Sequence, residues 1–163
     1  MSLVVSDTGL IHYLVLADLA DILPRLFATV FIPFAVQREL LHPSAPARVR
    51  SWLASAPAWL QVRDAGTSPL DSSTGAGERA AIALALEIKA DALLADDQRA
   101  RTEAAASGLV VIGTLGLIEL AAMRRIVDFE PAITRLLATN IFLSSTLIEQ
   151  SRSRVAAYLS LTP

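Results

Sequence analysis

The sequence contains no cysteine among its 163 residues. This absence excludes disulfide bonds, thiolate nucleophiles and the cysteine-containing zinc sites. Only His12 and His42 could supply an imidazole, so a zinc site of the usual kind is not expected, and we assign neither histidine a role. No G-x-S-x-G nucleophile elbow occurs, and Gly75-Ala-Gly77 lacks the following lysine of a phosphate-binding loop. Carboxylates therefore remain as the main candidates for chemistry.

Charged residues are also scarce. They make up 18% of the chain, the formal net charge is −2 and the isoelectric point is near 5.6. Such a protein has no general attraction to a nucleic-acid backbone, so any contact with nucleic acid must be local or mediated by bound cations. Hydrophobic residues account for 53%, which suits one domain with a sizeable core.

One apolar stretch, residues 104–123, contains a single charge, Glu119. It includes three glycines and follows a charged helical pattern, so a strand, a turn and a helix explain it better than a membrane span. The N-terminus lacks the basic region of a signal peptide, and Asp7 interrupts its apolar run. We therefore expect a cytoplasmic protein without a membrane segment.

Strand patterns alternate with helical patterns along the chain. Short apolar, β-branched runs predict strands at residues 3–6, 29–33, 59–63, 92–95 and 109–112. Amphipathic or apolar patterns predict helices at residues 12–20, 21–27, 34–42, 48–55, 78–89, 98–107, 114–125, 131–139 and 146–159, the last opened by a capping box at Thr146 and Glu149. Residues 64–77 are expected to form a long loop. The alternation predicts an α/β fold, a three-layer α/β/α sandwich with a central, mostly parallel sheet. We expect one domain over residues 1–163, with the C-terminal helices (about residues 129–160) packing on the core or on a partner.

Three aspartates follow predicted strands. Asp7 comes at the end of the first strand, and the carboxyl ends of strands are where open α/β sheets bind ligands. Taken alone, Asp7 is better explained as the N-cap of the next helix. Asp96 and Asp97 follow the strand at residues 92–95, where capping and solvent exposure would also account for them. In a parallel sheet, however, all three would lie at the same edge.

Two glutamates extend this candidate acidic group. Glu78 lies in the first turn of the most apolar predicted helix, a position that the helix dipole favours in any case. Glu39 lies late in a short helix after Pro33, where an ordinary solvated surface is the simplest explanation. If these carboxylates meet, their oxygen atoms are the natural ligands of Mg²⁺ or Mn²⁺.

Hydroxyl and guanidinium groups accompany the acids. Thr8 and Thr114 are the hydroxyls nearest the predicted strand ends, where turn or capping roles would suffice to explain them. Arg99 and Arg101 follow the aspartate pair. Arg101 lies four residues after Asp97, a spacing that suits an intrahelical salt bridge as well as a phosphate contact.

Five short motifs occur in order along nearly the whole chain. They are residues 5–8 (VSDT), 32–40 (IPFAVQREL), 77–84 (GERAAIAL), 93–101 (LLADDQRAR) and 111–116 (VIGTLG). Together they resemble the PIN-domain superfamily of metal-dependent ribonucleases. The likeness is greatest to a small prokaryotic PIN-like branch of largely unassigned function, related to VapC-type toxins.

The resemblance implies a PIN-like fold and an Mg²⁺- or Mn²⁺-dependent endoribonuclease that hydrolyses RNA phosphodiesters. It also implies a homodimer, and it raises the role of a toxin held in check by an antitoxin protein. By the same resemblance the catalytic residues are Asp7, Glu39, Glu78 and Asp97. The metal ligands come from this group together with Asp96, and Thr8, Thr114, Arg99 and Arg101 line the surrounding pocket.

Two positions depart from the family pattern. Gly9 replaces the serine that usually follows Asp-Thr, and Ala80 stands where related proteins often carry a second acid. The alternative function is therefore a catalytically weak or inactive PIN-like module for binding or assembly. A Rossmann-like phosphatase shares the first aspartate, but it usually has a second aspartate at the position of Gly9.

Overall fold

The structure, a computed structural model, describes residues 2–66 and 75–163. Within these two ranges, five strands form a single all-parallel sheet in the order β3-β2-β1-β4-β5. Their bounds are β1 (Leu3–Ser6), β2 (Thr29–Pro33), β3 (Leu60–Arg63), β4 (Ala92–Leu94) and β5 (Val111–Ile112). The expected α/β class is confirmed, and the sheet is wholly rather than mostly parallel. Because β1 is the central strand, its carboxyl end lies in the middle of the ligand-binding edge.

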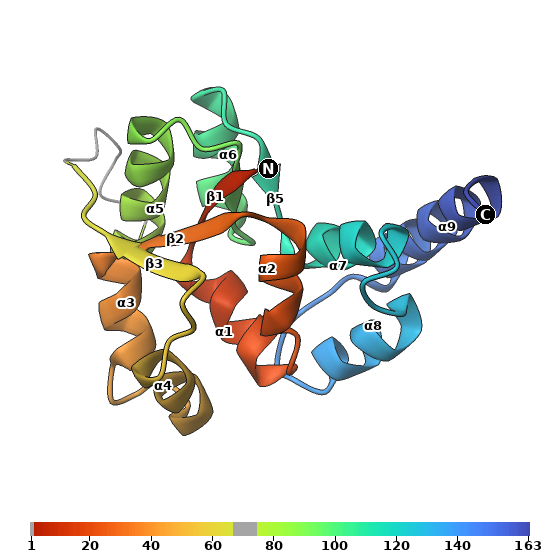
Figure 1. Ribbon diagram of the computed structural model, residues 1–163, viewed down its shortest axis with the longest axis horizontal. Helices are drawn as coiled ribbons and strands as arrows, with labels where there is room; N and C mark the ends of the chain where they lie inside the picture. Colours follow the sequence, from red (N-terminus) through yellow and green to blue (C-terminus); the bar gives the residue numbers. More distant parts are fainter. Residues whose placement is uncertain (1, 67–74) are drawn as a thin grey trace.

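Helices cover both faces of the sheet (Figure 1). They are α1 (Thr8–Leu16), α2 (Leu23–Leu26), α3 (Phe34–Leu41), α4 (Ala47–Ala54), α5 (Ala76–Glu87), α6 (Gln98–Ala106), α7 (Thr114–Met123), α8 (Phe129–Leu137) and α9 (Ser145–Leu161), with a 3₁₀ turn at Ala20–Ile22. The strands bury side chains on both faces, as their nearly continuous apolar sequences require. Val4 and Leu94 face the layer that contains α1 and α7, whereas Val5 and Leu93 face α5 and α6.

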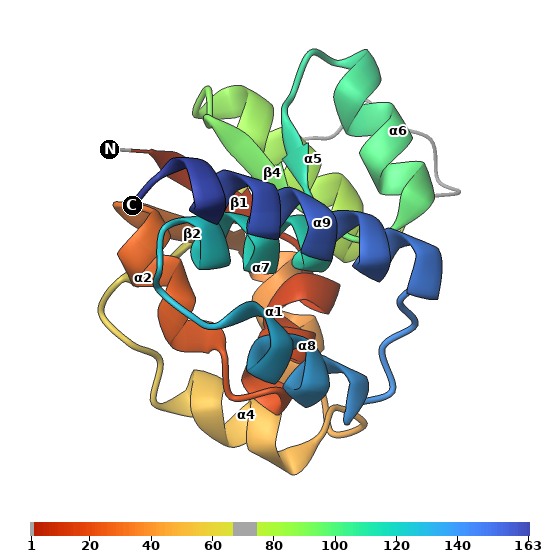
Figure 2. The ribbon, with the colours of Figure 1, turned by 90° about the vertical axis from the view of Figure 1, so that its right-hand side faces the viewer.

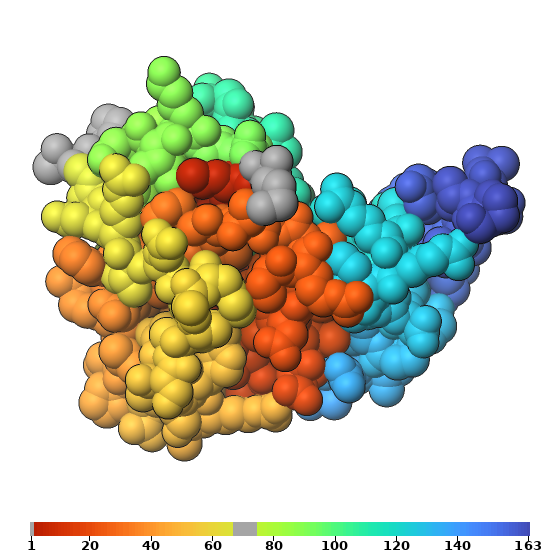
Figure 3. Space-filling view, in the orientation of Figure 1, coloured from red at the N-terminus to blue at the C-terminus, as the bar shows by residue number. Residues whose placement is uncertain are grey.

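The C-terminal helices lie to one side of the sheet. Helix α8 packs against α1 and α7, and α9 packs along α7 (Figure 2). Buried Ile148 and Val155 face this contact, while the carboxylate of Glu119 on α7 accepts hydrogen bonds from Ser151 and Arg154 of α9. The end of α9 projects as an arm that a notch separates from the α5–α6 side (Figure 3).

Several predicted boundaries shift for local reasons. Helix α1 begins four residues earlier than expected, because Asp7 caps it directly after the strand. The capping box predicted at Thr146 is wrong: Ser144 has the extended backbone of an N-cap and accepts a hydrogen bond from the N–H of Leu147, so Thr146 is already helical. Helix α6 ends as predicted, since Gly108 follows it with a φ of 81°.

The sequence also predicts a long loop at residues 64–77 and no membrane span at residues 104–123. Most of the expected loop, residues 67–74, lies outside the described residues. The apolar stretch at residues 104–123 is divided between the end of α6, β5 and α7. Within the described ranges, none of the helices combines the length and the apolar character needed to span a membrane.

Candidate active site

The carboxyl ends of β1 and β4 bring two strand-to-helix turns together. Ser6 pairs with Leu94 in the parallel register, and the N–H of Asp7 donates to the carbonyl of Leu94 at 2.9 Å. The β1–α1 turn, which carries Asp7, therefore lies beside the β4–α6 turn, which carries Asp96 and Asp97.

Asp7 is the buried acid of this edge, with 2% of its surface exposed. Its Oδ1 caps α1 by accepting a hydrogen bond of 3.0 Å from the N–H of Leu10. Burial raises its pKa from 3.8 to about 7; the N–H groups of Leu10 and Asp96 oppose this change, and the charges of Asp96 and Glu78 add to it. Capping and electrostatic coupling to other acids thus coexist at one carboxylate.

Asp96 is anchored to the start of α7. Its Oδ1 accepts a hydrogen bond from the N–H of Thr114 at 2.7 Å, and its Oδ2 accepts one from the hydroxyl of Thr114 at 2.5 Å. Thr114 is fully buried. This pair fixes the side chain of Asp96 between the β4–α6 and β5–α7 turns, where its charge acts on Asp7.

Asp97 behaves differently although it is the next residue. It is exposed, and its Oδ1 accepts a hydrogen bond of 2.9 Å from the N–H of Ala100, so that it caps α6. Asp96, and not Asp97, is among the groups that shift the pKa of Asp7. The exposed member of the pair therefore has a sufficient structural role of its own.

Glu39 reaches the edge from α3. Its carboxylate accepts hydrogen bonds from the hydroxyl of Thr8 and, at 3.1 Å, from the N–H of Gly77 at the start of α5. A Cβ at Gly77 would lie 2.9 Å from Cδ of Glu39, so a larger residue at this position would require the Glu39 side chain to move. Glu78 follows on the same turn, close enough for its charge to raise the pKa of Asp7.

The two arginines have different environments. Arg99 is exposed on α6, whereas Arg101 is half-buried. Nη1 of Arg101 would lie 3.0 Å from a Cβ at Gly113, as would Oδ1 of Asp96. Arg101 thus places a guanidinium beside the acidic edge, at the point where β5 leads into α7.

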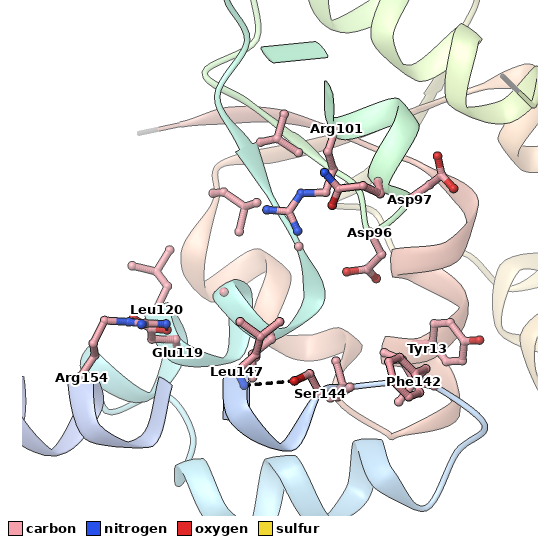
Figure 4. A pocket seen from close by; sticks show the side chains of 18 of the residues that line it. Tyr13, Asp96, Asp97, Arg101, Glu119, Leu120, Phe142, Ser144, Leu147 and Arg154 are labelled. Atoms are coloured by element: carbon pink, nitrogen blue, oxygen red, sulfur yellow. Dashed lines mark hydrogen bonds and ion pairs between the residues drawn. The ribbon is translucent and has the colours of Figure 1, made fainter. Parts of the chain in front are cut away.

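A cavity of about 1040 Å³ opens from this point (Figure 4). Asp96, Asp97 and Arg101 lie at one end, and Glu119 and Arg154 at another. Its walls are mainly apolar and come from β5, α7, the segment before α9 and the first turn of α9: Val111, Ile112, Leu115, Leu120, Met123, Ile141, Phe142, Leu143 and Leu147, with Tyr13 from α1. It is large enough for a small organic ligand or a nucleotide.

The acidic edge suits a divalent cation in its chemistry. Across residues 2–66 and 75–163, no three acidic or histidine side chains converge closely enough to hold a metal ion by themselves. Mg²⁺, however, usually takes only one or two protein carboxylates and fills its other positions with water and substrate phosphate. Burial and the charges of Asp96 and Glu78 raise the pKa of Asp7. A bound cation would stabilise the charged form of this carboxylate.

Comparison with known protein families identifies the family of this chain. A family model described as a PIN domain matches residues 3–157. The chain belongs to the PIN-domain family. PIN domains are generally nucleases and typically use divalent metal ions. No curated protein sequence matches the chain.

The cavity was not predicted from the sequence. Its walls come from four separate segments, and no local pattern connects Phe142 or Tyr13 with the aspartates. The role of Gly113 was also missed, although a glycine directly before a predicted helix, and after an apolar strand, could have been read as a point of close approach. Asp7, Asp96, Asp97 and Glu78 were found because each follows a strand or opens a helix, whereas Glu39, late in its helix, has no such local signal.

Proposed function

We propose that this PIN domain is an Mg²⁺- or Mn²⁺-dependent endoribonuclease that hydrolyses RNA phosphodiesters at the edge formed by Asp7, Asp96, Glu39 and Glu78. The observation that carries the proposal is the buried carboxylate of Asp7, whose pKa of about 7 reflects burial and the charges of Asp96 and Glu78. Titratable groups whose pKa values are strongly shifted by burial and by neighbouring like charges are concentrated at active sites.

In this proposal Asp7 and Asp96 are the ligands that hold the metal, and Glu78 adds negative charge. We assign the ligand role to Asp96 rather than Asp97, because Asp97 is exposed and caps α6. A bound Mg²⁺ would lower the pKa of a water molecule and neutralise charge on the phosphate. Thr114 would orient Asp96, and Thr8 with Gly77 would orient Glu39, through the hydrogen bonds that they donate.

A metal-dependent cleavage assay tests the proposal. Wild-type protein, Asp7→Asn and Asp97→Asn are incubated with mixed RNAs in Mg²⁺, in Mn²⁺ and in EDTA. We expect cleavage by the wild type and by Asp97→Asn only with metal, and none by Asp7→Asn. Metal-dependent cleavage by purified Asp7→Asn at the wild-type rate would contradict the proposal.

The alternative is a binding or assembly module with little activity. One observation favours it: the carboxylate oxygens of Glu39 and Asp96 already accept hydrogen bonds from protein groups. In that case the wild type would bind RNA or a protein without cleaving RNA in any metal.

The remaining expectations concern partners and organisation. We infer one domain over residues 1–163, a homodimer, and a cytoplasmic location. A role as the toxin of a toxin-antitoxin pair would require an antitoxin protein that abolishes cleavage. Co-expression with a candidate antitoxin protein, followed by the same assay, tests that role.

A further inference from the structure

The cavity beside the acidic edge shares Asp96 with the candidate active site. An RNA strand with a phosphate at Asp7 and Asp96 must place its neighbouring nucleotides within reach of this edge. The cavity begins there and extends between β5, α7 and the segment at residues 141–144. Its mainly apolar walls do not suit a phosphate, but they suit the face of a nucleobase.

Phe142 is the most exposed large apolar side chain among the described residues, at 90%. It lines the cavity on the same side as Tyr13 (Figure 4). An aromatic ring in this position costs free energy in water unless a ligand covers it, and stacking on aromatic rings is how proteins commonly hold unpaired bases. Tyr13 is itself supported by an edge-on contact with His12, with ring centroids 4.8 Å apart.

Arg101 supplies a positive charge at the junction between the acidic edge and the cavity. Its Nη1 lies beside Gly113, where the missing side chain leaves room for both the guanidinium and Asp96. A phosphate between the scissile position and a base in the cavity would pass this point. An Arg guanidinium binds phosphate through two parallel hydrogen bonds.

We propose that this cavity binds an unpaired base next to the scissile phosphate, with Phe142 as the stacking surface and Arg101 as the phosphate contact. The inference rests on the proposed function, because it takes single-stranded RNA as the ligand. It adds the position of a base site, and the base there must be unpaired, since a base within a duplex cannot leave its stack without a cost in free energy.

Binding of a short, unstructured, fluorescein-labelled oligoribonucleotide tests the proposal. Its phosphorothioate linkages resist hydrolysis, and anisotropy is measured with Mn²⁺ and in EDTA. In the full-length protein, Phe142→Ala and Phe142→Leu are expected to weaken binding on the order of 10-fold, whereas Phe142→Trp retains it. Leu161→Ala changes another highly exposed apolar position, at the end of α9 and outside the cavity, and is expected to bind as the wild type does.

Single abasic substitutions in the probe identify the base. At one position the abasic probe should lose affinity for the wild type and become insensitive to Phe142→Ala. The proposal is overturned if the wild type does not bind the probe in either condition, or if Phe142→Leu binds like the wild type. It is also overturned if Phe142→Ala changes only the oligomeric state in sedimentation velocity, since the cavity would then be an interface between copies.

These outcomes are separable from those of the cleavage assay. Binding that depends on Phe142, without metal-dependent cleavage, keeps the base site and rejects the nuclease. Cleavage with binding independent of Phe142 rejects the base site alone.

Discussion

The β1–α1 and β4–α6 turns share the same local structure, but the aspartates that cap their helices have different environments. In each turn an aspartate after a parallel strand caps the following helix: Asp7 caps α1 through Leu10, and Asp97 caps α6 through Ala100. Asp7 is buried beside two other acids, whereas Asp97 is exposed. In the second turn the preceding residue, Asp96, takes the inward position.

This difference shows that capping geometry alone does not identify a functional carboxylate. Both caps satisfy a backbone N–H at the start of a helix, and each is worth about 1 kcal/mol. Only Asp7 also carries the cost of holding a charge in a buried site near like charges. Substitutions in the two turns can separate the capping role of each aspartate from its electrostatic role.

The largest expected effect is on the pH dependence of stability in metal-free protein. Asp7 has a pKa of about 7 when folded and an ordinary value of 3.8. The folded state therefore holds a proton that the unfolded state releases between these values. The contribution of Asp7 should lower the free energy of unfolding by about 3 kcal/mol as the pH rises from 4 to 7.

Asp7→Asn should abolish this part of the pH dependence, because Asn keeps the Oδ1 acceptor for Leu10 but carries no charge. Urea unfolding in EDTA at several pH values measures it, with Asp97→Asn as the matched control that retains the wild-type slope. An unchanged slope in Asp7→Asn would show that the buried carboxylate is not the titrating group.

A second effect concerns the coupling between the two turns. Asp96→Asn removes a negative charge that raises the pKa of Asp7, so that pKa should move down toward its ordinary value. Asp97→Asn should leave it unchanged. NMR titration of the Asp7 carboxyl carbon measures both; equal shifts in the two variants would mean that the exposed aspartate is coupled as strongly as the inward one.

Gly77→Ala tests the position of Glu39. The added methyl group would contact the carboxylate that Thr8 and the N–H of Gly77 hold, so Glu39 must move away from the start of α5. Alanine also favours the helix, so we expect stability to change by less than about 1 kcal/mol. Cleavage should fall about 10-fold, because Glu39 belongs to the proposed catalytic edge and groups that orient such a side chain have effects of this size. The cleavage assay with Mg²⁺, beside thermal unfolding, measures both quantities.

Asp97→Ala has the smaller effect expected of an exposed cap. It should cost about 1 kcal/mol of stability, through loss of the hydrogen bond from Ala100, and leave metal affinity as in the wild type. Thermal unfolding and Mn²⁺ titration of this variant check the two parts. A loss of metal affinity as large as that of Asp7→Asn would reverse the assignment of Asp96 and Asp97.

The smallest effect is expected for Gly9→Ser, which introduces the hydroxyl that is usual in the family. A Cβ at Gly9 would contact only Oδ1 of Asp7 within 4 Å, at 3.9 Å, so the β-carbon of a serine fits without displacement. We expect stability within about 0.5 kcal/mol of the wild type, and cleavage equal to or above that of the wild type. Circular dichroism and the cleavage assay measure the two.

Much of the fold could be predicted because its signals are local. Runs such as Leu3–Ser6 and Thr29–Pro33 bury side chains on both faces, and each is followed by a residue that opens a helix. Two helix starts were less accurate. Asp7 was recognised as a possible N-cap, but the predicted helix began four residues too late. The cap of α9 is Ser144 and not Thr146, and because Ser and Thr both favour the N-cap, the sequence does not distinguish them.

The candidate site could be predicted only in part. Parallel strands bring their carboxyl ends to one edge, so the neighbourhood of Asp7 and Asp96 followed from the order of strands and acids. Which of Asp96 and Asp97 turns inward depends on Thr114, which comes from a different strand-to-helix turn. The cavity near Phe142 depends on the packing of α7 against the last segment, which no periodicity in the sequence encodes.

The most direct test of the central claim is calorimetric titration of Mn²⁺ into the wild type, Asp7→Asn and Asp97→Asn at neutral pH. If the edge around Asp7 is a metal site, the wild type and Asp97→Asn bind Mn²⁺ with similar affinity. Asp7→Asn then shows no binding, while its metal-free form unfolds at the same temperature as the wild type or higher. Undiminished Mn²⁺ affinity in Asp7→Asn would contradict the account.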